Sequence, residues 1–142
     1  MTGTLRTWLL SYAVAAVVYA AIDVAWIATV AGNQYQSQIG HLLAPTVNPV
    51  GAALFYLAYV VGMVHYGVRP NAPDASLRQR VAGGALFGFF TYATWALTAL
   101  AVLKGFPVWV AVTDIAWGVA VCSAVTFLTV TLLRRIITAP RA

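Results

Sequence analysis

Four long apolar stretches, about residues 7–30, 49–68, 82–103 and 109–133, most constrain what this chain can fold into. A helix needs roughly 20 apolar residues to cross a bilayer, and each stretch meets that length. Backbone groups in lipid are satisfied only within helices or closed β-barrels, and the alternating pattern of barrel strands is missing here. The sequence therefore predicts an all-α membrane protein in which one domain, residues 1–142, forms a bundle of four transmembrane helices.

The basic residues are distributed asymmetrically among the segments that connect these stretches. Seven of the eight lie before the first stretch, between the second and third, or after the fourth: Arg6, Arg69, Arg78, Arg80, Arg134, Arg135 and Arg141. The eighth, Lys104, follows the third stretch. Because basic loops stay in the cytoplasm, both termini are predicted to be cytoplasmic. The net charge of +5 is then a signal of topology, and nucleic-acid binding, which needs a clustered basic face, is not expected.

The connection between the first two stretches, residues 32–49, is long and contains no Lys or Arg. Its apolar side chains recur at helical spacing, at Tyr35, Ile39, Leu42 and Leu43. This pattern favours a short interfacial helix that lies on the outer membrane face. Pro49 is expected to open the second span, and Asp74 or Ser76 to cap the third.

Two of only three acidic residues lie inside apolar stretches, and a tryptophan follows each of them three residues later. Asp23 precedes Trp26 in AIDVAWI, and Asp114 precedes Trp117 in TDIAWG. An ionised carboxylate in a membrane helix costs roughly a few kcal/mol, so it must face the bundle interior, pair, or take up a proton. With the predicted topology, the helical rise puts both aspartates in the outer half of the membrane.

These positions predict one polar cluster on the outer side of the bundle. Its expected members are Asp23, Asp114, Trp26, Trp117, His41, Thr98 and Tyr19, with Lys104 near its rim. If the two carboxylates approach closely, one should hold a proton at neutral pH. In the structural alternative, the aspartates brace neighbouring helices and the tryptophans form an interfacial belt. The spacing of the possible ligands predicts no metal site, and no cofactor is identified.

Small residues recur in the third and fourth stretches. Gly84 and Gly88 form a GxxxG motif, and Gly118 and Cys122 lie four residues apart. Such ridges let helix backbones approach closely, either within one chain or between partners.

Several segments of the chain together resemble the DUF2177 family of small bacterial inner-membrane proteins. They are AIDVAWI, QIGHLLAP, ALFYLAYVVGMVHYGVRP, GALFGFFTYATW and VTDIAWG, in chain order, and they cover nearly the whole sequence. Asp23, Asp114, Trp117 and His41 match the family pattern. The resemblance implies a four-span protein of the bacterial inner membrane, and it supplies no reaction.

The segment TYATWALTAL departs from the pattern T-Y-x-T-Y-D-L-T-N that the resemblance implies. Trp95 stands in place of the second tyrosine, Ala96 in place of the aspartate and Ala99 in place of the asparagine. If that carboxylate and amide serve catalysis, this chain is expected to bind or support rather than to catalyse.

Three functions therefore remain open at the level of sequence. The favoured one is a non-catalytic accessory or scaffold subunit of a membrane complex, because no reaction motif is visible. The second is a binder or enzyme for a lipid-soluble small molecule: a fatty acyl chain, quinone, isoprenoid or pigment. The third is a proton or cation transporter. Membrane lipid is an expected partner, together with a larger membrane-protein complex or further copies of the chain.

Overall fold

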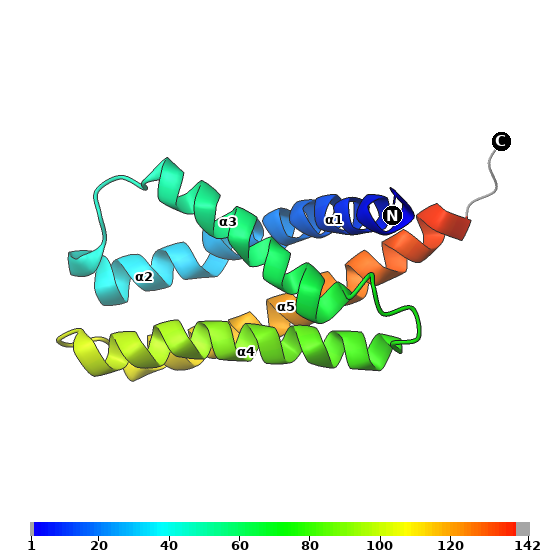
Figure 1. Ribbon diagram of the computed structural model, residues 1–142. Helices are drawn as coiled ribbons and strands as arrows, with labels where there is room; N and C mark the ends of the chain where they lie inside the picture. The colour runs from blue at the N-terminus through cyan, green and yellow to red at the C-terminus, as the bar shows by residue number, and fades with distance from the viewer. Residues whose placement is uncertain (1, 139–142) are drawn as a thin grey trace.

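The computed structural model describes residues 2–138, which form a bundle of long helices with short connections (Figure 1). Arg141, counted among the basic residues of the tail, lies outside the described residues. The elements in chain order are α1 (Thr2–Trp26), the π-helical turn η1 (Ile27–Ala31), α2 (Gly32–Ile39), the 3₁₀ turn η2 (Gly40–Leu42), α3 (Pro49–Met63), the π-helical turn η3 (Val64–Val68), α4 (Leu77–Val102) and α5 (Val108–Thr138).

Four of the helical segments are long and apolar enough to cross a membrane. They are Thr4–Leu42, Pro49–Val68, Leu77–Val102 and Val108–Ile136. The predicted all-helical chain with four long apolar helices is therefore confirmed. The second segment coincides with the stretch predicted from sequence, whereas the third begins at Leu77 rather than at residue 82.

Side-chain caps fix where the second and third long segments begin. The Asn48 carboxamide oxygen accepts hydrogen bonds from the backbone N–H groups of Val50 and Gly51, just before α3. At α4, the Ser76 hydroxyl accepts from the Gln79 N–H, and the Gln79 side chain accepts from the Ser76 N–H. This capping box starts α4 one turn before its apolar run, so Ser76 rather than Asp74 is the cap.

The helix expected in the first connection is present, but it continues directly from α1. The π-helical turn η1 joins α1 to α2, and the Gly32 N–H bonds to the Ile27 carbonyl across this turn. Ile39, 4% exposed, packs into an apolar cluster with residues of α4 and α5. Leu42 and Leu43, expected on the same face, stay exposed because the 3₁₀ turn η2 changes the helical phase after Ile39.

The helices α4 and α5 form the most closely packed pair of the bundle. A Cβ atom added at Gly88 would lie 2.0 Å from the Gly118 carbonyl oxygen, and one added at Gly84 would lie 2.9 Å from the Cys122 carbonyl oxygen. The small-residue ridges of the two helices therefore pack against each other within one chain. The sequence alone had left open whether they pack within the chain or against a partner.

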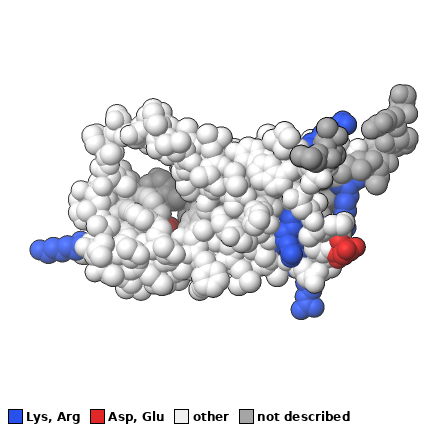
Figure 2. All heavy atoms as spheres, viewed as in Figure 1, with Lys and Arg blue, Asp and Glu red and all other residues white. Residues whose placement is uncertain are grey.

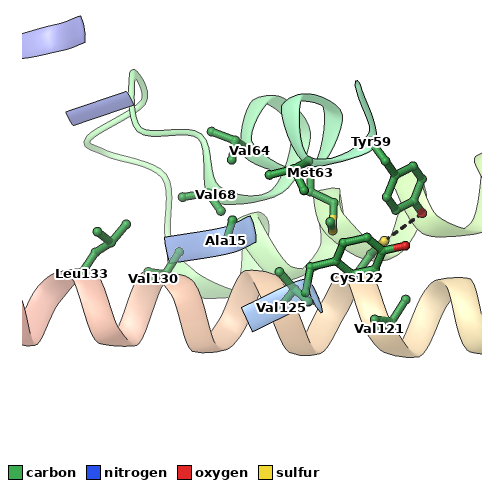
Figure 3. Packing of buried hydrophobic residues seen from close by; sticks show 12 residues of the cluster. Ala15, Tyr59, Met63, Val64, Val68, Val121, Cys122, Val125, Val130 and Leu133 are labelled. Carbon is green, nitrogen blue, oxygen red and sulfur yellow. Dashed lines mark hydrogen bonds between the residues drawn. The ribbon is translucent and has the colours of Figure 1, made fainter. Parts of the chain in front are cut away.

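The main apolar core lies between α1, α3–η3 and α5 (Figure 3). Ala15 of α1, Met63 beside η3 and Val125 of α5 are fully buried in it. At its edge, the Tyr59 hydroxyl and the Cys122 thiol form a hydrogen bond of 3.2 Å, drawn as a dashed line in Figure 3. This core holds α1 and α3 against the tight α4–α5 pair.

Charge divides the bundle into two different ends. The start of α1, the connection from η3 to α4 and the end of α5 lie at the same end (Figure 1). Lys and Arg side chains gather there (Figure 2), and we call it the basic end. Lys104 follows α4 at the opposite end, which we call the Lys104 end.

One basic residue at the basic end has a structural role that sequence did not indicate. Arg80, in the first turn of α4, is only 8% exposed. Its guanidinium donates to the carbonyls of Arg69 (2.7 Å), Ala72 (2.5 Å) and Ala75 (3.0 Å), and also to that of Val68. These carbonyls belong to the end of η3 and the following connection, so Arg80 supplies the donors that a helix end lacks.

Candidate functional site

A cavity of about 450 Å³ lies toward the Lys104 end, between the continuous α1–α2 helix and α3, and it is bounded by α4 and α5. Figure 2 shows a hollow at this end of the molecule, with acidic atoms visible inside it. Both Asp23 and Asp114 line the cavity, and each is only 5% exposed. We call it the aspartate cavity.

Asp114 of α5 is held by donors from two other helices. The Tyr35 hydroxyl of α2 lies 2.7 Å from Oδ1 and 2.6 Å from Oδ2. The indole Nε1 of Trp95, on α4, donates to Oδ2 over 3.2 Å. Beside this site the Gln34 amide donates to the Thr113 hydroxyl over 3.2 Å. These bonds fasten α2 to α5, and they compensate the cost of burying the carboxylate.

Asp23 of α1 has a separate tyrosine partner. The Tyr56 hydroxyl of α3 donates to Oδ2 of Asp23 over 2.6 Å, which links α1 to α3. The two aspartates therefore face one cavity, while each accepts its own phenolic hydrogen bond. In the described part of the chain they form no hydrogen bond with each other.

The two tryptophans of the D-x-A-W segments stack on each other. The ring centroids of Trp26 and Trp117 are 4.1 Å apart and their planes are inclined by 7°. Both rings line the aspartate cavity, and the Trp117 indole N–H is buried without an acceptor within the described residues. Tyr19, also on the cavity wall, is fully buried.

The structure thus brings five of the eight expected cluster residues to one cavity: Asp23, Asp114, Trp26, Trp117 and Tyr19. The other three, His41, Thr98 and Lys104, are exposed and lie outside its walls. His41 lies on η2, beyond the break in helical phase at Ile39. Thr98 lies one turn beyond Trp95, the α4 residue that reaches Asp114. Lys104 lies in the turn between α4 and α5.

Residues not included in the expected cluster complete the site. Tyr35, Tyr56 and Trp95 donate to the two carboxylates, and Tyr92 and Phe55 contribute aromatic walls. The sequence offers one way to predict such residues: a buried carboxylate requires hydrogen-bond donors, and hydroxyl and indole groups can supply them. Among residues 2–138, no three His, Cys or acidic side chains gather into a possible metal site.

In a comparison with protein families, the profile described as a predicted membrane protein, DUF2177, matches residues 8–131. The chain belongs to the DUF2177 family. It is therefore a multi-pass membrane protein, and all residues of the aspartate cavity lie inside the matched region. Comparisons with curated proteins and with solved structures found no match.

The positions at which the chain departs from the resembled DUF2177 pattern now have locations in the structure. Trp95 contributes the second hydrogen-bond donor to Asp114. Ala96 and Ala99 are buried in an apolar cluster with Ile39 and Val110. An aspartate or asparagine at either position would be buried among apolar side chains, so the alanines suit this packing.

Proposed function

We propose that the protein binds a lipid-soluble small molecule in the aspartate cavity, and that this ligand presents a hydroxyl or amino group to Asp23 and Asp114. The observation that carries the proposal is a cavity in which two nearly buried carboxylates face aromatic walls. Its volume of about 450 Å³ is typical of small-molecule sites. Intramembrane carboxylates are costly, and they commonly mark functional sites.

Charge selects the polar group of the ligand. The walls contain two carboxylates and, within the described chain, no Lys or Arg side chain. A carboxylate can accept about four hydrogen bonds, and Asp23 accepts one from Tyr56. A ligand hydroxyl or ammonium can donate to the remaining positions, whereas a fatty-acid carboxylate would be repelled. A fatty acyl chain that ends in a free carboxylate is therefore a poor ligand for this cavity.

The aromatic walls suit the rest of such a ligand. Trp26, Phe55 and Trp117 offer flat apolar surfaces next to the carboxylates. Aromatic faces also attract ammonium groups, which adds to the preference for an amine.

A second cavity supports access from the lipid. This cavity of about 290 Å³ shares Tyr35, Phe55 and Tyr92 with the aspartate cavity and is lined mainly by α3 and α4. Trp95, on its wall, is 51% exposed. We therefore propose that a ligand dissolved in the membrane enters sideways, between α3 and α4.

The other functions considered have no comparable support in the structure. The GxxxG ridge that suggested a partner is used between α4 and α5 of the same chain. The accessory-subunit and transporter hypotheses therefore rest on sequence alone. We take the membrane to be the bacterial inner membrane and the cavity to lie on its outer side, as the family resemblance and the cation distribution predict.

The test uses three probes with one tail and different polar groups: dodecanol, dodecylamine and dodecanoate. Each probe is titrated into the protein in lipid nanodiscs, with empty nanodiscs as the blank. Binding is followed by the change in tryptophan fluorescence, to which the stacked Trp26 and Trp117 contribute together with three other tryptophans. We expect the amine and the alcohol to bind more tightly than the acid. Asp23→Asn should weaken amine binding about tenfold or more, since hydrogen bonds to charged groups contribute about 1.5–3 kcal/mol.

Asp74→Asn is the matched control, because Asp74 is exposed in the connection between η3 and α4. It should leave all three affinities unchanged. Tight binding of dodecanoate, or equal amine affinity in wild type and Asp23→Asn, would contradict the proposal.

A further inference from the structure

A groove toward the basic end is separate from the aspartate cavity. It has a volume of about 690 Å³ and lies between η3 and α4. Arg69 and His65 line one part of it, and Leu86, Phe87 and Phe90 of α4 line the other. We call it the Arg69 groove, and we propose that it binds an anionic phospholipid, with the phosphate at Arg69 and an acyl chain along α4.

A smaller pocket adjoins the polar part of the groove. This pocket, of about 220 Å³, shares His65 and Arg69 with the groove and is otherwise lined by Trp8 and the connection at Pro70, Asn71 and Ala72. Arg69 and His65 therefore lie where a polar pocket meets an apolar groove. A phospholipid has the same order of parts, with a charged headgroup followed by a hydrocarbon chain.

The position of Arg69 is fixed by the backbone. It ends η3 in a left-handed conformation with φ of 49°, and its N–H donates to the Val64 carbonyl over 2.7 Å. Its own carbonyl accepts from Arg80, whose charge is directed at backbone carbonyls. The Arg69 side chain remains exposed at the rim.

Charge complementarity favours an anion at this position. Arg69 and Arg134 are close enough to Arg80 for their charges to act on it. Asp23 and Asp114 lie in the aspartate cavity, so Asp74 is the one acidic side chain described near the basic end. A phosphate is therefore favoured over a neutral group in this positive field.

The apolar part of the groove argues for a lipid rather than for free phosphate. Gly83, Leu86 and Phe90 follow one another along a single face of α4 over roughly 10 Å, by the helical rise. Leu86 is 58% exposed and Phe90 is 62% exposed. At Gly83 a Cβ atom would lie 2.3 Å from the Tyr66 carbonyl oxygen, so glycine lets η3 approach α4 at the head of the groove.

The experiment compares two lipids with identical chains by native mass spectrometry of the detergent-solubilised protein. The probes are palmitoyl-oleoyl phosphatidylglycerol and palmitoyl-oleoyl phosphatidylcholine. We expect the wild type to retain the anionic lipid preferentially, and Arg69→Gln to reduce that preference about fivefold, the effect of one basic residue. Phe90→Ala should weaken retention of both lipids, because it removes chain contacts without changing charge.

Arg78→Gln is the matched control, since Arg78 is an exposed arginine in the first turn of α4, also at the basic end, and it does not line the groove. It should retain the wild-type preference, and Asp23→Asn should retain it too, because the aspartate cavity is separate. Equal retention of the two lipids by the wild type, or equal losses in Arg69→Gln and Arg78→Gln, would overturn the proposal. Displacement of phosphatidylglycerol by millimolar inorganic phosphate would also overturn it, since the headgroup alone would then account for binding.

Discussion

At the scale of single residues, the most informative contact is the one between Tyr35 and Asp114. Tyr35→Phe keeps the ring and removes the hydroxyl that lies 2.6–2.7 Å from both carboxylate oxygens. The carboxylate would then keep the weaker indole bond from Trp95. We expect a loss of about 1.5–3 kcal/mol in the free energy of unfolding, because the bond lost involves a charged acceptor. Unfolding by sodium dodecyl sulfate from a mild detergent measures this loss.

The control for this substitution is Tyr66→Phe. Tyr66 is 55% exposed, and its contacts are aromatic, with His65 and Phe87. Its hydroxyl should be dispensable for stability. A Tyr35→Phe protein as stable as Tyr66→Phe would mean that the carboxylate is satisfied by other donors.

Sequence could identify the aspartates but not their tyrosine partners. Asp23 and Asp114 were evident because a carboxylate inside an apolar stretch is costly wherever it lies. Tyr35 and Asp114 are 79 residues apart, and their contact depends on the helical phase that η1 sets. Arg80 was equally hidden, because an arginine at the edge of an apolar stretch predicts a loop cation and gives no sign of the carbonyls it binds.

At the scale of elements, the α4–α5 pair depends on the absence of side chains at its contact. In Gly88→Ala the new Cβ would lie 2.0 Å from the Gly118 carbonyl oxygen, so the helices would have to separate. We expect a loss of about 1–3 kcal/mol, the usual cost of overpacking. The same detergent unfolding assay measures it.

Gly51→Ala is the matched control, because it lies in the first turn of α3 and its added Cβ would meet nothing nearer than 3.8 Å. This variant should be unchanged, or more stable by up to about 1 kcal/mol, from the higher helix propensity of alanine. If Gly88→Ala unfolds like Gly51→Ala, the two helices are not in close contact.

The long helices were predictable from sequence, and their irregular joints were not. Apolar length alone located the stretch 49–68, and Pro49 marked where it begins. The π-helical turn η1 has no sequence signature, so the helix Gly32–Ile39 was expected to be a separate interfacial element rather than a continuation of α1. Apolar spacing therefore predicted that Ile39 lies on the apolar face of this helix. The direction of the helix was not predictable, because it depends on the contacts of Ile39 with α4 and α5.

At the scale of the whole molecule, the bundle has a different candidate binding site at each end. The aspartate cavity lies toward the Lys104 end and the Arg69 groove lies at the basic end. The first is lined by two carboxylates and the second by the Arg69 guanidinium, so the ligands we propose for them carry different polar groups: a donor for the cavity and an anion for the groove. The direction in which the bundle crosses the membrane then decides from which leaflet each ligand comes.

The cation distribution predicts that direction, with the basic end in the cytoplasm. Two single substitutions, Lys104→Cys and Arg78→Cys, place exposed thiols at opposite ends of α4. A membrane-impermeant maleimide added to intact bacterial cells should label Lys104→Cys at once and Arg78→Cys only after the membrane is permeabilised. The wild type is the blank in both conditions, because its free Cys122 is fully buried. Labelling in the reverse order would put the aspartate cavity on the cytoplasmic side, where its ligand would come from the inner leaflet.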